Sequence, residues 1–211
     1  VALLYQRDLF KLLSSRSISI PPLKQYRPTR DLLHVSGLLL TGDTLDVFVC
    51  HLPSRSGGAK ESESYRLYAA HILRMEVDSI MSIRSLPQVI IMGDFNDYPT
   101  NQSIQKILEA EAPPVTTNNL ASTTGSTNFS TVAPSSLKLY HLLARKAKSK
   151  DLGSYKYRGE WGLLDHLIVS GTLLNQSNHF FTSEEKANVC LLPFLLKDDE
   201  KYGDKEPFRT Y

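Results

Sequence analysis

Residues 90–97, with the sequence IIMGDFND, combine an apolar run with polar groups that could bind a cation and a phosphate. The run predicts a buried strand, and Asp94 and Asn96 follow it two positions apart. Side chains at i and i+2 point to the same side of an extended chain. A carboxylate and an amide oxygen would then lie together, as a hard divalent cation requires. Gly-Asp-x-Asn is equally good turn chemistry, so a solvated turn is the alternative interpretation.

A histidine stands in a comparable place, directly after the expected strand at residues 45–50. His51 opens the segment HLPSRSGG, in which Gly57 and Gly58 would let the backbone approach an anion closely. An imidazole there could donate to a phosphoryl oxygen or transfer a proton near neutral pH. The alternative is an incidental histidine in a surface loop.

Two further segments carry groups suited to phosphate chemistry. Arg30 precedes the expected strand 31–40, and its planar guanidinium suits phosphate oxygens, although an ion pair with Asp31 is an equal alternative. Asp165 lies in the segment LDHLIVS, where it could orient a catalytic histidine, pair with His166 for acid/base work, or be a charge at a strand entry. Trp161 could stack on a substrate or pack in the core.

Apolar periodicity predicts mixed strands and helices around these residues. We expect strands at residues 1–5, 31–40, 45–50, 88–92, 153–157 and 163–170. The three- and four-residue spacing of apolar positions predicts a long amphipathic helix over residues 61–83. Shorter helices are expected after Pro99 and over residues 137–148. Residues 111–136, rich in Pro, Thr, Ser and Asn, are expected to form a long loop.

Composition limits the class of protein. With 211 residues, 41% of them hydrophobic and 22% charged, the chain fits one globular domain. A net charge of +2 is too small to indicate nucleic-acid binding by bulk electrostatics. No apolar run approaches the roughly 18 residues of a membrane span. Phosphate affinity would therefore have to come from local sites.

Cys50 and Cys190 lie far apart and form no CxxC pattern, which argues against a disulfide framework or a structural zinc site. The chain opens without a signal peptide. We expect a soluble protein whose compartment stays open, with secretion or a periplasmic location if a signal was removed. The sequence indicates no particular protein partner.

In chain order, the motifs H-x-P-S-R-x-G-G, G-D-F-N-D and W-x-x-L-D-x-x-x-V-S resemble those of the endonuclease/exonuclease/phosphatase superfamily. The particular residues of these motifs are similar to those of a bacterial subgroup whose substrate is unassigned. The resemblance covers nearly the whole chain. It implies a DNase I-like α/β fold, a four-layer α/β/β/α sandwich of two mixed β-sheets flanked by helices. It also implies Mg²⁺- or Mn²⁺-dependent hydrolysis of a phosphoester.

The resemblance also implies roles for individual residues. His51 would contact the scissile phosphate, and Asp94 would activate or position the attacking water. Asn96 would steady the metal or the phosphate beside Asp94, and Asp165 would hydrogen-bond the catalytic histidine. His166 would then be a variable position. Substrate contacts are expected from Tyr5, Arg30, Arg55 and Trp161.

Two parts of the family pattern are not found. Members carry a metal-binding glutamate on an early element and a late Ser-Asp-His that supplies the general acid/base, and residues 1–211 contain no Ser-Asp-His. We therefore expect one domain over residues 1–211 that is incomplete at both ends. Residues 1–211 alone should be inactive or nearly so, because losing members of such a unit costs on the order of 10³–10⁶ in rate.

Nuclease-like phosphodiester hydrolysis is the first functional hypothesis. Hydrolysis of phosphomonoesters, inositol phosphates or lipid phosphates is the second, and a module that binds a phosphorylated ligand without turnover is a further alternative. A nuclease needs cations that follow a nucleic-acid backbone beside the site. The candidates are Arg55, Lys60, Arg145, Lys146, Lys148 and Lys150.

Overall fold

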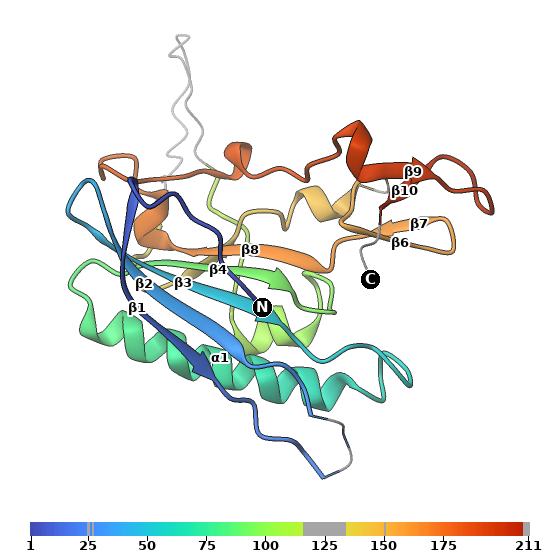
Figure 1. Ribbon diagram of the computed structural model, residues 1–211, viewed down its shortest axis with the longest axis horizontal. Coiled ribbons are helices and arrows are strands. Elements are labelled where there is room, and N and C mark those ends of the chain that lie inside the picture. The colour runs from blue at the N-terminus through green and yellow to red at the C-terminus, as the bar shows by residue number, and fades with distance from the viewer. Residues whose placement is uncertain (25, 27, 116–133, 150, 209–211) are drawn as a thin grey trace, which may run out of the picture.

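A computed structural model describes residues 1–24, 26, 28–115, 134–149 and 151–208. Its centre is a six-stranded mixed sheet in the order β1-β2-β3-β4-β8-β5 (Figure 1). These strands are β1 (Phe10–Ile18), β2 (Leu32–Leu39), β3 (Thr44–His51), β4 (Gln88–Asp94), β8 (Asp165–Ser170) and β5 (Leu139–His141). β3 and β4 run parallel, and the other neighbours pair antiparallel.

Two small hairpins lie at the same end of the molecule as the start of β8 (Figure 1). They are β6 (Tyr155–Tyr157) with β7 (Glu160–Gly162), and β9 (Leu196–Asp198) with β10 (Lys205–Pro207). Short helical turns complete the described elements: η1 (Ser103–Ile107), η2 (Lys146–Lys148), η3 (Gly171–Leu174), η4 (Glu184–Lys186) and η5 (Pro193–Leu195).

The long helix α1 (Glu63–Ile83) covers one face of the sheet (Figure 1). Its small and branched apolar residues point inward, and Leu73 is fully buried. The sheet contributes Phe48 and Ile91 to the same core, both also fully buried. The helix predicted from the apolar spacing is confirmed, because that spacing places one continuous stripe against the sheet.

The opposite face of the sheet is apolar as well. Val35, Val47 and Val169 are buried there. Part of the face is covered by the chain after β8, which contributes buried Leu173 and Ala187. Within the described ranges the structure thus holds one six-stranded sheet and the helix over one of its faces, which are two of the four layers expected.

The hairpin 31–50 and the strand at 88–92 are confirmed as β2–β3 and β4. Two predicted elements are wrong. Residues 1–5 are not a strand, and the edge strand is β1, whose exposed and polar positions give no apolar alternation. Residues 139–141 form strand β5 rather than a helix, because they pair with β8. Most of the loop predicted at 111–136 lies outside the described residues. Among the residues described, no helix is both long and apolar enough to cross a membrane.

The core under α1 supplies a test of the packing. Leu73→Ala should lower the free energy of unfolding by about 2–5 kcal/mol, because it leaves a cavity in a close-packed interior. Met75→Ala is the control on the same helix, since Met75 is exposed, and it should change stability by less than about 0.5 kcal/mol. Chemical denaturation measures both. Equal losses would contradict the assigned orientation of α1.

Candidate active site

Sheet pairing brings three of the expected residues into one row. His51 ends β3 and pairs with Asp94, which ends β4. Asp94 in turn pairs with Asp165, the first residue of β8. Directly paired residues on neighbouring strands point to the same face, and adjacent strands lie about 4.8 Å apart. An imidazole and two carboxylates therefore share one end of the sheet.

The imidazole and the central carboxylate of this row are close without forming a hydrogen bond. His51 Nε2 lies 3.8 Å from Asp94 Oδ2, and both side chains are about one-third exposed. That separation exceeds hydrogen-bonding distance but allows electrostatic attraction. Solvent or a ligand oxygen can reach both groups.

A tight turn presents Asn96 beside Asp94. Gly93 has φ 128° and Asn96 has φ 51°, so the chain leaves the extended conformation around Asp94. The expectation that Asp94 and Asn96 share one side of a strand is therefore wrong, and the turn interpretation is right about the backbone. The Asn96 N–H donates to Asp94 Oδ1 at 2.8 Å, and Asn96 Nδ2 donates to the Leu52 carbonyl at 3.0 Å. Among the described residues, no hydrogen bond engages the amide oxygen of Asn96.

Electrostatics mark Asp94 as the centre of the row. Burial raises the pKa of the Asp94 carboxyl above its usual value, and the neighbouring charge of Asp165 acts in the same direction. The hydrogen bond from the Asn96 N–H and the nearby charges of His51 and Arg30 oppose that rise in pKa. Two adjacent carboxylates, one of them partly desolvated, are stabilised by a bound cation.

The expected substrate-side residues separate into two groups. Arg30 is exposed and close enough to lower the pKa of Asp94. Trp161 lines a 410 Å³ pocket together with Asp165. The Arg55 guanidinium stacks over the Tyr98 ring, 4.9 Å from its centroid, in the segment after Asn96. These three lie around the row or beside its loops.

Tyr5 belongs to a different part of the molecule. Its ring packs edge-on against Phe10, with centroids 5.2 Å apart. Phe10 pairs with Leu39, the last residue of β2. The other end of β2 lies beside Val49, near the His51 end of β3. The register therefore places Tyr5 near the far end of the sheet, and the expectation of a substrate contact from Tyr5 is corrected.

His166 is buried and bonded internally. His141 Nε2 and His166 Nδ1 lie 2.6 Å apart, the Leu143 N–H donates to His141 Nδ1, and His166 Nε2 donates to the Asp97 carbonyl at 2.9 Å. These bonds use every ring nitrogen of two neutral imidazoles. Burial lowers the pKa of His141 to about 3 and that of His166 to about 4. The pair thus holds the turn at residues 94–97 through the Asp97 carbonyl. The expected acid/base pairing of Asp165 with His166 receives no support from these contacts.

The sequence reasoning missed two residues that support the turn. Arg66 and Asp97 form a fully buried ion pair at 2.8 Å between α1 and the residue after Asn96. The signal was present in the sequence, because Arg66 falls on the apolar stripe with Ala69, Ala70 and Leu73. A cation at a core position needs a buried anion.

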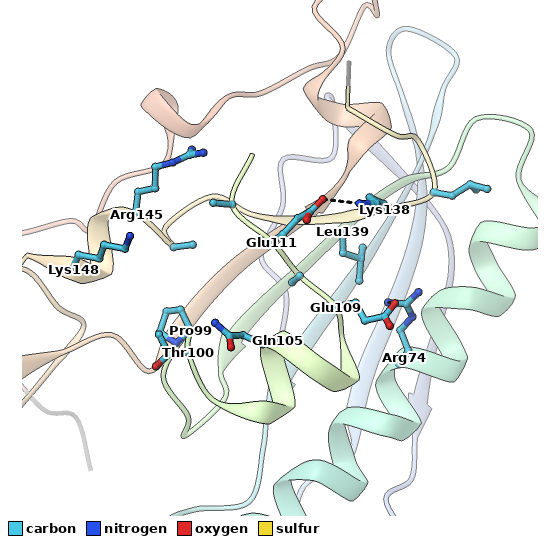
Figure 2. Close-up of a pocket in the computed structure, with 14 residues that line it drawn as sticks. Arg74, Pro99, Thr100, Gln105, Glu109, Glu111, Lys138, Leu139, Arg145 and Lys148 are labelled. Carbon is cyan, nitrogen blue, oxygen red and sulfur yellow. Dashed lines mark hydrogen bonds and ion pairs between the residues drawn. The ribbon is translucent and has the colours of Figure 1, made fainter. Parts of the chain in front are cut away.

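A separate hollow of 700 Å³ is lined in part by Pro99 and Thr100, which follow the turn at residues 94–97 (Figure 2). It contains none of the residues of the row. Three of its four cations are paired: Arg74 with Asp78, Lys138 with Glu111, and Arg145 with Glu184. Figure 2 shows the Lys138–Glu111 pair at its rim. We assign this hollow no part in the site.

The donor set at the row fits a hard divalent cation in its chemistry. Asp94, Asn96 and Asp165 offer carboxylate and amide oxygens, which Mg²⁺ and Mn²⁺ prefer. Among the residues that the structure describes, no group of three or more His, Cys, Asp or Glu side chains converges on one point. The row would thus supply part of a coordination shell.

The sequence matches the endonuclease/exonuclease/phosphatase family over residues 1–211, and the chain belongs to this family. Members of the family are hydrolases that act on phosphoester bonds. A comparison with curated proteins found no match.

Solved structures of this family share the fold at low sequence identity. The catalytic domain of human nocturnin, determined with a bound sulfate anion, is 20% identical with a TM-score of 0.50 over 79% of this chain and 50% of that one. Truncated TDP2 from Caenorhabditis elegans is 14% identical with a TM-score of 0.50, covering 78% and 54%. A family protein from Bacteroides thetaiotaomicron is 15% identical with a TM-score of 0.50, covering 79% and 52%. The fold is thus α/β and DNase I-like, and the chain spans about half the length of these neighbours.

Gly93 provides a test of the turn. A Cβ at this position would lie 2.0 Å from the Cys50 carbonyl oxygen, and its φ of 128° disfavours any side chain. Gly93→Ala should therefore cost more than about 2 kcal/mol of unfolding free energy. Gly57→Ala is the matched control, with φ 84° and no atom within 4 Å of the added Cβ, and should cost only about 1 kcal/mol. Equal costs would contradict the close approach of β3 and β4 at this point.

The buried histidine pair predicts a pH dependence of stability. The unfolded chain protonates both imidazoles below about pH 6.5, whereas the folded pKa values are about 4 and about 3. The stability that the two neutral imidazoles contribute is fully present above about pH 6.5. It is lost as the pH falls toward the folded pKa values. Between pH 7 and pH 5 the free energy of unfolding should fall by roughly 3–4 kcal/mol, about half of it from each imidazole.

The matched variant for this test replaces both His141 and His166 with Gln and should show little slope over the same interval. Asp46 does not interfere, because its pKa is lowered to about 2 and its contribution changes only below about pH 4. Denaturation series at each pH measure both proteins. A flat profile for the unsubstituted protein would refute the neutral pair.

Proposed function

We propose that the protein is a divalent-metal-dependent phosphoesterase, and that its first activity is nuclease-like hydrolysis of a phosphodiester. The observation that carries the proposal is the row His51–Asp94–Asp165, in which register alone brings one imidazole and two carboxylates to the same end of the sheet. Membership in a family of phosphoester hydrolases supports the same conclusion.

The residues of the row and their neighbours Arg30 and Asn96 would each have a separate role in the reaction. The His51 imidazole would donate a hydrogen bond to a phosphoryl oxygen, and Arg30 would add positive charge at the same end of the sheet. The Asp94 carboxylate, whose pKa is raised by burial, would orient the attacking water. Asn96 would turn its amide oxygen toward the cation, since its NH₂ group is committed to the Leu52 carbonyl.

Asp94, Asn96 and Asp165 would hold the cation. A divalent ion there would neutralise charge on the phosphoryl group and lower the pKa of a bound water. Asp165 would in addition accept a hydrogen bond from a catalytic histidine. Its backbone is fixed by the bond from the Asp165 N–H to Ser154 Oγ, 3.1 Å long.

Small phosphoesters are the second candidate substrates. They are favoured because two of the cations expected to bind a nucleic-acid backbone are held by hydrogen bonds within the protein. Lys146 Nζ donates to the Glu184 and Ala187 carbonyls and to Asn188 Oδ1. Arg145 donates to Glu184 and to the Pro113 carbonyl. Two of the six cations proposed for a nucleic-acid backbone therefore hold the segment 184–188 in place, and Lys150 lies outside the described residues.

Hydrolysis of bis(4-nitrophenyl) phosphate and of 4-nitrophenyl phosphate tests the proposal, with Mg²⁺ or Mn²⁺ and with EDTA. The assay uses the natural protein that contains this sequence. Asp94→Asn should lower kcat/KM by roughly 10²-fold or more, because it removes the charge that orients water and holds the cation. Asp78→Asn is the control, an exposed acid paired with Arg74 on α1.

Turnover that persists unchanged in EDTA, or that is equal in Asp94→Asn, would refute the proposal. Phosphate binding that survives EDTA without any hydrolysis would favour the non-catalytic module. A preference for the monoester would make a phosphomonoesterase the function of the site.

A further inference from the structure

Arg66 is an arginine in the interior of the protein. It lies on the core-facing side of α1 and is 1% exposed. A buried guanidinium is tolerated only where its charge and its donors are satisfied. Its partners therefore show what the residue holds in place.

Each of the three partners of the guanidinium lies in or beside a loop of the site. Nε donates to Asp97 Oδ1 at 2.8 Å, Nη1 donates to Ser62 Oγ at 2.6 Å, and Nη2 donates to the Ala59 carbonyl at 2.6 Å. Asp97 follows Asn96 directly. Ala59 belongs to the loop that leads from His51 to the start of α1. One planar side chain thus joins the two loops.

Asp97 is held from three directions. Its carboxylate accepts from Arg66 and from Ser103 Oγ, the latter at 2.7 Å, and its carbonyl accepts from His166 Nε2. Because Asp97 is the next residue after Asn96, these bonds fix the end of the turn that presents Asn96. The position of that amide oxygen depends on them.

The loop after His51 begins at the fully buried Leu52, and its glycine-containing part, further on, has fewer contacts. Gly57 and Gly58 have positive φ, and residues 52–59 belong to no strand or helix. Ser62 Oγ donates to the Gly58 carbonyl at 2.6 Å while it accepts from Arg66. Arg66 and Ser62 therefore fix the glycine-containing part of this loop, in which Arg55 also lies.

We infer that Arg66 is a positioning residue of the active site, which sets the geometry of the phosphate-side loop 51–59 relative to the metal-side turn 94–97. This role rests on the proposed function of the row. Arg66 touches no reacting atom and acts through Asp97 and Ala59. Without its fork the two loops would stay joined at Leu52, which bonds Asp94 and Asn96, and by the Arg55–Tyr98 contact, but the part around Gly57 and Gly58 would be free to shift. Misplacement by about 1 Å can cost on the order of 10²-fold in rate.

A partly buried ion pair at the end of the same helix supplies a control. Arg84 follows the end of α1 and donates to Asp46, whose side chain is fully buried, and to Ser36 Oγ. Arg84 has the same guanidinium chemistry as Arg66, and its side chain is 30% exposed against 1% for Arg66. Its partners lie on β2 and β3, away from the loops of the site.

Hydrogen exchange tests the tie without any need for turnover. In Arg66→Met, amides in both 52–62 and 94–101 should exchange at least about 10-fold faster, because one side chain restrains both segments. Arg84→Met should leave both segments unchanged. The milder variant Ser62→Ala, which keeps the ion pair, should loosen 52–62 alone, and it answers the question if Arg66→Met does not fold. Faster exchange in only one segment of Arg66→Met, or in both segments of Ser62→Ala, would overturn the inference.

Kinetics give the second measurement, made at a temperature where every variant is folded. Arg66→Met should lower kcat about 10- to 100-fold with KM for bis(4-nitrophenyl) phosphate changed far less. Arg66→Lys keeps the charge but not the fork and should recover part of the loss. Unchanged kcat in folded Arg66→Met, or an equal loss in Arg84→Met, would show a purely structural role. An inactive natural protein would refute the proposed function, and exchange would then decide the tie alone.

Discussion

The pairing of β4 with both β3 and β8 fixes the position of the polar groups in the candidate site. β3 and β4 run parallel, so both end at the same edge, and β8 runs the other way, so it begins there. A shift of one residue in either pairing would send a side chain of the row to the opposite face. His51, Asp94 and Asp165 can act together only because this register is specified on both sides of β4.

That register is specified by burial on both faces of the sheet. Phe48 and Ile91 face α1, and Val47 and Val169 face the opposite cluster. Every slip would expose one set of apolar residues and bury polar ones, and each large apolar side chain is worth about 1.5–3 kcal/mol on burial. The apolar core therefore holds the row of charges in line at its edge.

Beyond the edge of the sheet, buried polar bonds act together with the apolar packing of Leu52 and Phe95. Residues 95–97 and 52–59 lie past the last strand pairs, and their positions depend in part on Arg66, Asp97 and the neutral His141–His166 pair. Such networks are costly to leave half-satisfied, so they favour one arrangement strongly. The site combines a rigid sheet edge with loops held by a few directional bonds.

Sequence patterns predicted the buried elements and failed at the edges. α1, β2, β3 and β4 carry their periodicity in apolar side chains, whereas β1 is largely exposed and β5 exists only through its pairing with β8. The motif residues Asp94 and Asn96 were recognised, but the positive φ of Asn96 arises from a turn that strand periodicity does not describe. Arg66 was overlooked although a cation in an apolar stripe was visible. The substrate role of Tyr5 rested on the family resemblance alone, and its ring packs instead against Phe10 at the start of β1.

Binding of Mn²⁺ tests the central claim most directly, because the paramagnetic ion broadens the NMR signals of nearby nuclei. Titration of the ¹⁵N-labelled protein should broaden the amide signals of His51, Asp94, Asn96 and Asp165 first, and Asp94→Asn should abolish that selectivity. Broadening centred elsewhere in the molecule, or unaltered in Asp94→Asn, would contradict a cation site at this end of the sheet.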